Sequence, residues 1–374
     1  MSQEGGYHSL PVPDRADHLW RYTPWNRIHP TGKTEEIPSD VSPALLAMSL
    51  LDGSETPEGI SLEVSEADSR STTDVATAFI RELCDGESVC LKVRNGTILE
   101  QPLLLTIESN GEVAGLHLTL DIGANCEFEF VTIVQGSGGW FGFLRDGVVG
   151  ANCNLNDVVV NKTSENTNLL RVDAIRLEND AQTKFGTVGA GGIRTKADLR
   201  YELAGRGCSA EVNGSILSAD KQHNDHHVEL LHQAKESYSR LLWHSSCAGK
   251  SRTIGTGMLR VAHGAKGADA GQLFHNLLLS EQAEADSIPE LEVLENEVVG
   301  CGHGTANGPL DEEQSFYLRS RGFDEAQTTG LLIAAFLNAT LSQMGSHHLH
   351  EWLNELLAGG LSSITGESIA DYVS

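Results

Sequence analysis

The sequence is short of the features that mark metal-cluster proteins, secreted proteins and membrane proteins. Its seven cysteines are odd in number and scattered, and no two have the Cys-x-x-Cys spacing of zinc ribbons and ferredoxin-type sites. No apolar run approaches the roughly 18 residues that a membrane-spanning helix needs. Residues 1–20 have neither the basic start nor the apolar stretch of a signal peptide. We therefore expect a cytoplasmic protein with reduced thiols.

Basic residues are also scarce. The chain has 26 Lys and Arg against 52 Asp and Glu, which gives a formal net charge of -26. Nucleic acid and anionic lipid are bound by clustered Lys and Arg, so we expect neither as a partner. The hydrophobic content of 40% excludes a disordered chain, and 39 Gly against 10 Pro favour many tight turns.

The hydrophobic pattern divides the chain into three regions. Residues 1–85 contain helix candidates at 43–51 and at 74–84, the second with Asp74 as N-cap. Residues 86–300 are a succession of short apolar or alternating runs separated by Gly, Asn and Asp, which predicts about a dozen strands. Periodicity leaves a sandwich, a barrel and a β-solenoid open, and it favours a solenoid or another double-layered β architecture.

Residues 301–374 are predicted to be helical. Capping sequences begin at Asp311 and Asp324, and Gly322 is a suitable helix stop. A later helix carries an apolar stripe at helical spacing, formed by Leu349, Trp352, Leu353, Leu356 and Leu357. We interpret this stripe as internal packing rather than a partner surface, and we expect Gly359 and Gly360 to end the helix.

Histidines are concentrated between residues 222 and 232. If this segment is a strand, His223, Asp225 and His227 share one face, and His232 follows them. Histidine is the commonest metal ligand and carboxylates orient it, so one interpretation is a metal site. The other is a polar ladder that satisfies buried groups or lies at an interface.

A second cluster, Cys301-Gly302-His303-Gly304, lies where the pattern changes from strand to helix. A thiol and an imidazole freed by flanking glycines could bind iron or a soft metal, or act as a catalytic pair. A turn with an incidental cysteine is the third interpretation. Because two ligands do not hold a metal alone, a partner chain or other residues would have to complete the site.

The segment 244–251 contains the Gly-Lys-Ser of a phosphate-binding loop, but it does not satisfy the rest of that motif. His244 stands where the first glycine is required, and no helix pattern follows. We therefore expect this chain to bind no nucleotide.

Several motifs, in the same order and at similar spacing, resemble the SufB/SufD family of iron-sulfur cluster assembly proteins. They are Leu-Trp-Arg-Tyr-Thr-Pro at 19–24, the Gln222 to His232 series, Ser-Ile-Pro-Glu-Leu-Glu-Val at 287–293, Cys-Gly-His-Gly-Thr at 301–305, Leu-Asp-Glu-Glu at 310–313 and Phe-Tyr-Leu-Arg-Ser-Arg-Gly at 316–322. The resemblance spans nearly the whole chain. It favours SufD over SufB, because SufB chains carry an active cysteine in the segment that corresponds to 271–289, and none is present here.

The resemblance implies a mainly β fold, a right-handed parallel β-helix flanked by N-terminal and C-terminal helical regions. The three regions would then be an N-terminal helical region (1–85), the β-helix core (86–300) and a C-terminal helical region that docks the SufC ATPase (301–374). Candidate SufC-docking residues are Phe316, Tyr317, Arg319, Arg321, Leu332 and Phe336.

The resemblance also implies a function. The chain would be a non-enzymatic scaffold subunit of the SUF system that pairs with a SufB-like subunit and binds SufC, with sulfur supplied indirectly by cysteine desulfurase. Its cargo would be iron or a nascent iron-sulfur cluster shared with SufB. His303 matches a histidine implicated in cluster formation and is the candidate iron ligand, with Cys301 beside it. Such a complex can carry reduced flavin, although this chain shows no flavin motif.

Two alternatives stay open at this point. One is a homodimeric scaffold that works with SufC alone. The other is a β-helix or cupin-like metal enzyme that uses His223, His227 and His232. In the scaffold interpretation, these three histidines and Asp225 are candidates for an interface or a secondary metal site.

Overall fold

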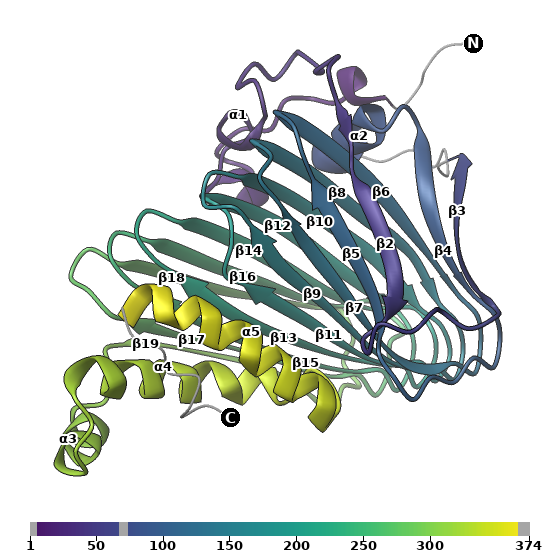
Figure 1. Ribbon diagram of the computed structural model, residues 1–374. Helices are drawn as coiled ribbons and strands as arrows, with labels where there is room; N and C mark the ends of the chain where they lie inside the picture. The colour runs from purple at the N-terminus through teal and green to yellow at the C-terminus, as the bar shows by residue number, and fades with distance from the viewer. Residues whose placement is uncertain (1–5, 67–73, 366–374) are drawn as a thin grey trace.

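The computed structural model describes residues 6–66 and 74–365. Its strands wind into a solenoid with two long sheets, which we call sheet A and sheet B (Figure 1). Sheet A consists of β1 (Ser42–Pro43), β3 (Ile60–Glu66), β4 (Glu87–Val93), β6 (Val113–Ile122), β8 (Trp140–Val149), β10 (Asn168–Leu177), β12 (Arg194–Leu203), β14 (His223–His232), β16 (Arg252–Val261) and β18 (Glu284–Val293). Sheet B consists of β2 (Leu45–Leu50), β5 (Leu103–Ser109), β7 (Glu127–Gly136), β9 (Asn154–Thr163), β11 (Gln182–Gly189), β13 (Ser209–Ser218), β15 (Tyr238–Cys247), β17 (Asp269–Leu278) and β19 (Gly300–Gly308).

From β4 onward, consecutive strands alternate between the two sheets, and each strand pairs in parallel with the strand one coil away. Leu170 on β10, for example, pairs with Gly142 on the preceding coil and with Lys196 on the following one. Only β2 and β3, at the N-terminal end, pair antiparallel with their neighbours in the described part of the chain. The predicted mainly β fold and parallel β-helix are therefore confirmed, and the sandwich and barrel are excluded.

One corner of successive coils is built from a repeated pair of residues. The first residue of each pair has a positive φ between 56° and 72°, at Asn125, Asn152, Asp180 and Gly207. Asn, Asp and Gly tolerate this left-handed conformation, and the amides of these residues donate to carbonyl oxygens of the next coil. The second residue is small and buried, at Cys126, Cys153, Ala181 and Cys208. Several of the scattered cysteines thus have a packing role.

The space between the sheets is filled by apolar side chains, with glycines where a large ring crosses the interior. A Cβ atom added to Gly214 would lie 2.2 Å from the Trp243 ring, and one added to Gly255 would lie 2.6 Å from the Phe274 ring. Close packing of this kind leaves no room for substitution at either glycine without movement of the ring.

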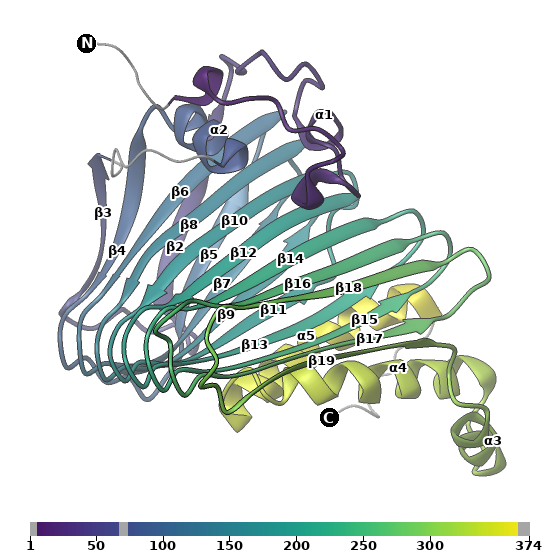
Figure 2. The same ribbon diagram turned by 180° about the vertical axis from the view of Figure 1, so that it is seen from behind.

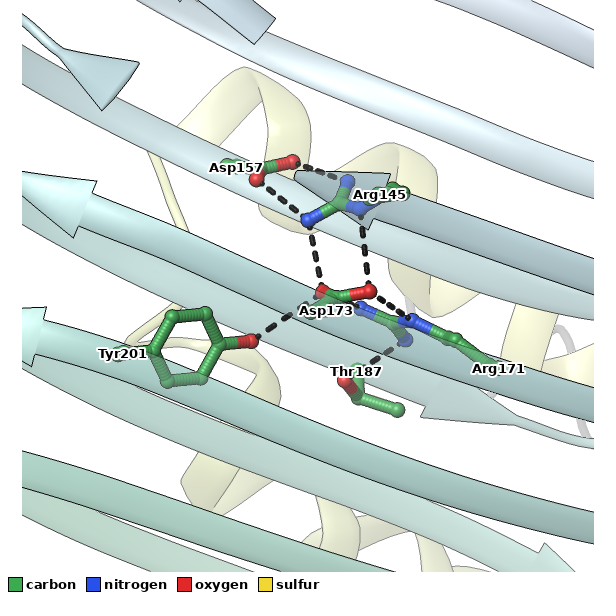
Figure 3. A network of polar contacts seen from close by, with 6 residues as sticks. All are labelled: Arg145, Asp157, Arg171, Asp173, Thr187 and Tyr201. Carbon is green, nitrogen blue, oxygen red and sulfur yellow. Dashed lines mark hydrogen bonds and ion pairs between the residues drawn. The ribbon is translucent and has the colours of Figure 1, made fainter. Parts of the chain in front are cut away.

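A charged network also lies inside the solenoid and joins the two sheets (Figure 3). Arg145 on β8 donates to both carboxylate oxygens of Asp157 on β9, at 3.0 and 2.8 Å, and to Asp173 on β10, at 2.9 Å from Oδ2. Arg171 donates to the same Asp173, at 2.7 Å, and to Thr187 on β11, at 3.2 Å. The two arginines neutralise the two aspartates, which is the condition for burying such charges.

The N-terminal region lies over the outer face of sheet A (Figure 2). Its helical elements are η1 (Tyr7–Ser9), η2 (His18–Trp20), α1 (Trp25–Ile28) and α2 (Val75–Leu83). The helix expected at 74–84 is confirmed, because the Asp74 side chain accepts hydrogen bonds from the amides of Ala76 and Thr77.

The helix expected at 43–51 is wrong, because this segment forms β1 and β2. Its Leu, Ala and Met residues favour a helix locally, but Leu45–Leu50 pairs antiparallel with β5. This pairing supplies hydrogen-bond partners to the first strand of sheet B, which outweighs the local preference. Strands thus occur before residue 86, and β19 crosses residue 300, so the three-region division of the chain stays a prediction.

The C-terminal helices are α3 (Glu312–Ser320), α4 (Glu325–Leu341) and α5 (His347–Thr365). Asp324 and Gln327 form the expected capping box of α4, and Gly322 follows α3 with a φ of 102°. Helices α4 and α5 cover the outer face of sheet B, where Leu349, Leu353 and Leu357 are buried. The apolar stripe is therefore internal packing, as predicted. The expected stop at Gly359-Gly360 is wrong, since α5 continues to Thr365. Within the described ranges, no helix is long and apolar enough to cross a membrane.

Candidate functional site

The solenoid is open at the end formed by its last coil. Among the described residues, β18 and β19 are the terminal strands of their sheets, and each is hydrogen-bonded to a neighbouring strand on one side only (Figure 2). Such an edge presents unpaired backbone N–H and C=O groups, which natural proteins usually cover or blunt. Helices α2, α4 and α5 pack on the outer faces of earlier coils. The last coil is contacted from the N-terminal region at its outer face, where His18 Nδ1 of η2 lies 3.3 Å from Glu290 of β18.

Cys301 and His303 lie on β19, at this open end. The register places Cys301 beside Ala270 and His303 beside Gln272, and both of these β17 residues are buried inside the solenoid. Alternation along the strand therefore turns both side chains to the inner face of the last coil. His303 is exposed there because no further coil covers it.

Cys301 is half-buried and packs against a small apolar cluster of Val261, Ala265 and Ala268. Burial raises the pKa of its thiol, and Asp269 adds to this effect. A thiol in this state is a poor nucleophile and a poor metal ligand until a cation or a partner lowers its pKa.

Polar side chains surround the inner face of the last coil. Asn276 Nδ2 donates to Ser287 Oγ at 2.8 Å and to Asn307 Oδ1 at 2.7 Å, which links β17, β18 and β19. Gln272 Nε2 donates to the Glu290 carbonyl at 2.9 Å. The sequence analysis did not propose these residues as site residues, although Ser287 begins the motif at 287–293. The sequence pattern does not show that Asn276, Ser287 and Asn307 meet, because they come from three different strands.

Apolar side chains are exposed around the same end. Leu291 and Val293 on β18 are 38% and 39% exposed, and Leu294 and Val299 in the following turn are 57% and 73% exposed. An exposed apolar group next to unpaired strand edges is typical of an interaction surface. We call the last coil with these residues the open-end surface.

The predicted His223 and Asp225 lie elsewhere, on the outer face of sheet A beneath the N-terminal region. Thr23 Oγ1 donates to Asp225 at 2.6 Å and lies 2.8 Å from Nε2 of His223. Lys196 also donates to Asp225, at 3.0 Å, in an ion pair that is almost fully buried. Two motifs that are far apart in sequence therefore meet, and they attach the N-terminal segment to the sheet.

His227 and His232 do not join a common site. His227 lies on the outer face and contacts Thr256 Oγ1 at 2.9 Å, whereas His232 faces the interior and contacts Ser237 and Ser239 at 2.8 and 2.7 Å. The described residues contain no group of three or more His, Cys, Asp and Glu side chains that could hold a metal ion. The site of the alternative metal enzyme, made of His223, His227 and His232, is therefore not formed, because the odd and even positions of β14 face opposite sides.

Burial keeps these histidines neutral. It lowers the pKa of His223 to about 4, of His227 to about 3 and of His232 to about 4. Desolvation is the largest cause in each case, since it disfavours the charged imidazolium. Their contacts with Thr23, Thr256, Ser237 and Ser239 fit the polar-ladder interpretation of the cluster.

The candidate SufC-docking residues fall into two groups. Helix α3 extends away from the solenoid in both views and has no buried residue (Figures 1 and 2). Phe316 and Tyr317 on it are 75% and 56% exposed, Arg319 and Arg321 are exposed, and Arg321 lies 5.1 Å from the Tyr317 ring. Leu332 and Phe336 on α4 are half-buried, and the Phe336 ring stacks on His244 at 4.3 Å.

The segment 244–251 contains the end of β15 and a turn, and β16 follows it. The helix that a phosphate-binding loop requires at this point is replaced by a strand. His244 instead contacts the Phe336 carbonyl at 2.7 Å, which fixes α4 to sheet B.

Comparison with known proteins agrees with these structural features. Residues 106–336 match the family described as SUF system FeS cluster assembly, SufBD core domain. The chain is 28% identical over 360 residues to the iron-sulfur cluster assembly SufBD family protein Rv1462 of Mycobacterium tuberculosis, which covers 91% of this chain and 87% of that protein. It is 27% identical over 356 residues to the iron-sulfur cluster assembly protein SufD of Escherichia coli, which covers 87% of this chain and 84% of that protein.

Proposed function

Because this chain belongs to the SufBD family of SUF-system iron-sulfur cluster assembly proteins, we propose that it is a SufD-like scaffold subunit that pairs with a SufB-like subunit and binds the SufC ATPase. The observation that carries the proposal is the open-end surface. Strands β18 and β19 offer unpaired edges, exposed apolar side chains and an inward-facing His303 in one place. The proposed complex is cytoplasmic.

A second solenoid would complete this surface. Pairing its edge with β18 or β19 would satisfy the backbone groups and bury the apolar side chains around Leu291 and Val299. The inner face of the last coil would then lie between two subunits rather than in solvent. A SufB-like subunit is the proposed occupant, because it has the same kind of coil and this chain lacks the SufB cysteine segment.

His303 has the proposed role of iron ligand at that interface. An exposed imidazole supplies one donor, and a single donor holds iron only when a partner supplies others. Cargo bound in this way, iron or a nascent cluster, is released when the subunits separate. Cys301 would join it if a cation lowered the thiol pKa, which burial now raises.

SufC has a separate proposed surface, at α3. ATP hydrolysis would take place in SufC and sulfur would reach SufB from cysteine desulfurase, so this chain would need neither a nucleotide site nor a catalytic centre of its own. We propose that it supports assembly without catalysing a reaction.

The test is co-expression of this chain with the SufB and SufC chains of the same genome, followed by size-exclusion chromatography with light scattering. We expect a complex of one SufB, one copy of this chain and two SufC. His303→Ala should assemble normally but support less cluster formation in reconstitution, because only the iron donor is lost. His263→Ala is the matched control, since His263 is also exposed but lies in a turn outside the last coil.

Two results would contradict the proposal. If the chain forms a complex with neither SufB nor SufC, it is not a scaffold subunit of this system. If His303→Ala and His263→Ala reconstitute clusters equally well, His303 has no role in cargo binding.

The homodimeric scaffold is the second candidate, because the open-end surface could equally pair with a second copy of this chain. It predicts a self-dimer that binds SufC and does not exchange with SufB in the same light-scattering experiment.

A further inference from the structure

A cavity of about 520 Å³ lies between the N-terminal segment and the starts of three strands of sheet A. Residues 26–32 form one wall, and the first residues of β8, β10 and β12 form the other. It lies apart from β18, β19 and α3, so nothing in the proposed scaffold role uses it. Its polar lining includes Asn26, Arg27, Glu112, Asn166, Asn168 and Arg194.

Two arginines meet at this cavity without a carboxylate partner. Within the part of the chain that the structure describes, no ion pair of Arg27 or Arg194 with a carboxylate is formed at 4.0 Å or less. Arg194 donates instead to two neutral oxygens, the Arg27 carbonyl at 3.1 Å and Asn168 Oδ1 at 3.3 Å. Burial and the nearby Arg27 charge together lower the pKa of Arg194.

With 52 Asp and Glu against 26 Lys and Arg, a carboxylate is available to pair with most cations. Arg176, Arg206 and Arg260 each pair with glutamates on neighbouring coils of the same solenoid. Two like charges kept together at a cavity cost free energy that an anion bound between them would offset.

The charge and size of the cavity restrict the class of anion. A phosphate monoester carries close to two negative charges at neutral pH and matches two guanidinium groups, which bind phosphate in a bidentate manner. A single carboxylate would leave one arginine unpaired. The cavity volume of about 520 Å³ is many times the roughly 30 Å³ that one water molecule occupies. The cavity therefore has room for a phosphate group and for the rest of a small molecule. Amide groups of Asn26, Asn166 and Asn168 can hydrogen-bond a polar remainder.

We propose that this cavity binds a phosphate-bearing small molecule through Arg27 and Arg194. The exposed carboxylate of Glu112 at the rim is the only acidic side chain among the described lining residues, and it opposes anion entry. This site is independent of partner binding at the open-end surface.

Isothermal titration calorimetry on the full chain tests the proposal, with ribose 5-phosphate and inorganic phosphate as probes and ribose as the probe without phosphate. We expect both phosphate probes to bind and ribose not to bind. Tighter binding of ribose 5-phosphate would identify an organic phosphate as the natural class, whereas equal binding would identify free phosphate.

Arg194→Gln and Arg27→Gln should each weaken binding at least about 10-fold, because each removes a charge-assisted contact. Arg27 is exposed, so its replacement leaves the core intact even if Arg194→Gln perturbs folding. Arg206→Gln is the matched control, an arginine on the same solenoid far from this cavity, and it should bind like the wild type. Two results would overturn the proposal. One is the absence of binding heat from both phosphate probes at about 10 mM, and the other is an Arg206→Gln variant that loses as much affinity as Arg194→Gln and Arg27→Gln.

Discussion

At the scale of single residues, the interior of the solenoid depends on charges that neutralise one another. Arg145 is fully buried and holds Asp157 and Asp173 in ion pairs of 2.8 and 2.9 Å. Arg171 compensates Asp173 from the other side, at 2.7 Å, whereas Asp157 has Arg145 as its ion-pair partner. The opposite charges also lower the pKa of the Asp173 carboxyl, despite its burial.

We therefore predict that Arg145→Met lowers the free energy of unfolding by about 3–5 kcal/mol, because it leaves Asp157 buried and uncompensated. Urea unfolding followed by circular dichroism measures the effect. Arg206→Met is the control, with an expected change below about 1 kcal/mol, since the Arg206–Glu236 pair is exposed. Adding Asp157→Leu to Arg145→Met should restore part of the loss, and a double variant no more stable than the single one would contradict this account.

At the scale of elements, α3 differs from every other helix of four or more residues that the structure describes. Helices α1, α2, α4 and α5 each bury apolar side chains against the solenoid, but α3 buries none. Its capping residue Asp311 accepts from the amide of Gln314 at 2.9 Å, so the helix is held by its cap and by contacts with α4. A helix that leaves the aromatic side chains of Phe316 and Tyr317 in solvent is suited to bind a partner.

If α3 docks SufC, as proposed, Phe316→Ala should weaken SufC binding by about 2 kcal/mol, roughly 30-fold, because exposed aromatic residues often dominate interface energies. The urea midpoint of the isolated chain should not change, since Phe316 contributes no buried contact. Binding is measured by calorimetry with purified SufC. His348→Ala on α5 is the control for an exposed residue outside α3. Unchanged affinity in Phe316→Ala would place the SufC surface elsewhere.

At the scale of the whole molecule, buried histidines make the stability of the solenoid dependent on pH. Burial lowers the pKa of His226 and His227 to about 3 and of His223 and His232 to about 4. The unfolded chain binds protons at these histidines near pH 6.5, whereas the folded chain does not. Stability is therefore fully present above pH 6.5 and is lost as the pH falls towards 4.

We predict that each of these histidines contributes up to about 1.4 kcal/mol per pH unit to the slope between pH 6 and pH 4.5. His226→Leu should reduce the slope by one such contribution. The side chain of His226 lies inside the solenoid, 5.0 Å from the Trp243 ring, where an apolar group is tolerated. The measurement is urea unfolding of the wild type and of His226→Leu at about pH 7, 6 and 5, with the unfolding midpoints compared. A slope that is the same in both proteins would show that His226 is not protonated on unfolding.

Much of the fold and part of the candidate site follow from the sequence alone. Alternating short runs predict the strands of both sheets, Asp74 and Asp324 predict two helix starts, and the order of motifs predicts the SufB/SufD family. These features succeed because they rest on local chemistry, namely capping, alternation and residue identity at fixed spacing. The sequence likewise excluded a phosphate-binding loop at 244–251 for want of its first glycine and of a helix.

Only the tertiary structure decided which residues meet. It turned 43–51 into strands by pairing them with β5, and it carried α5 through Gly359 because sheet B supports that helix. It joined Thr23 to His223 and Asp225, and separated His232 from them, since contacts between coils depend on register and face. The exposure of His303 also depends on the tertiary structure. The sequence gives the imidazole and its flanking glycines, but only the winding of the whole solenoid places His303 on the last coil, where no further coil covers it.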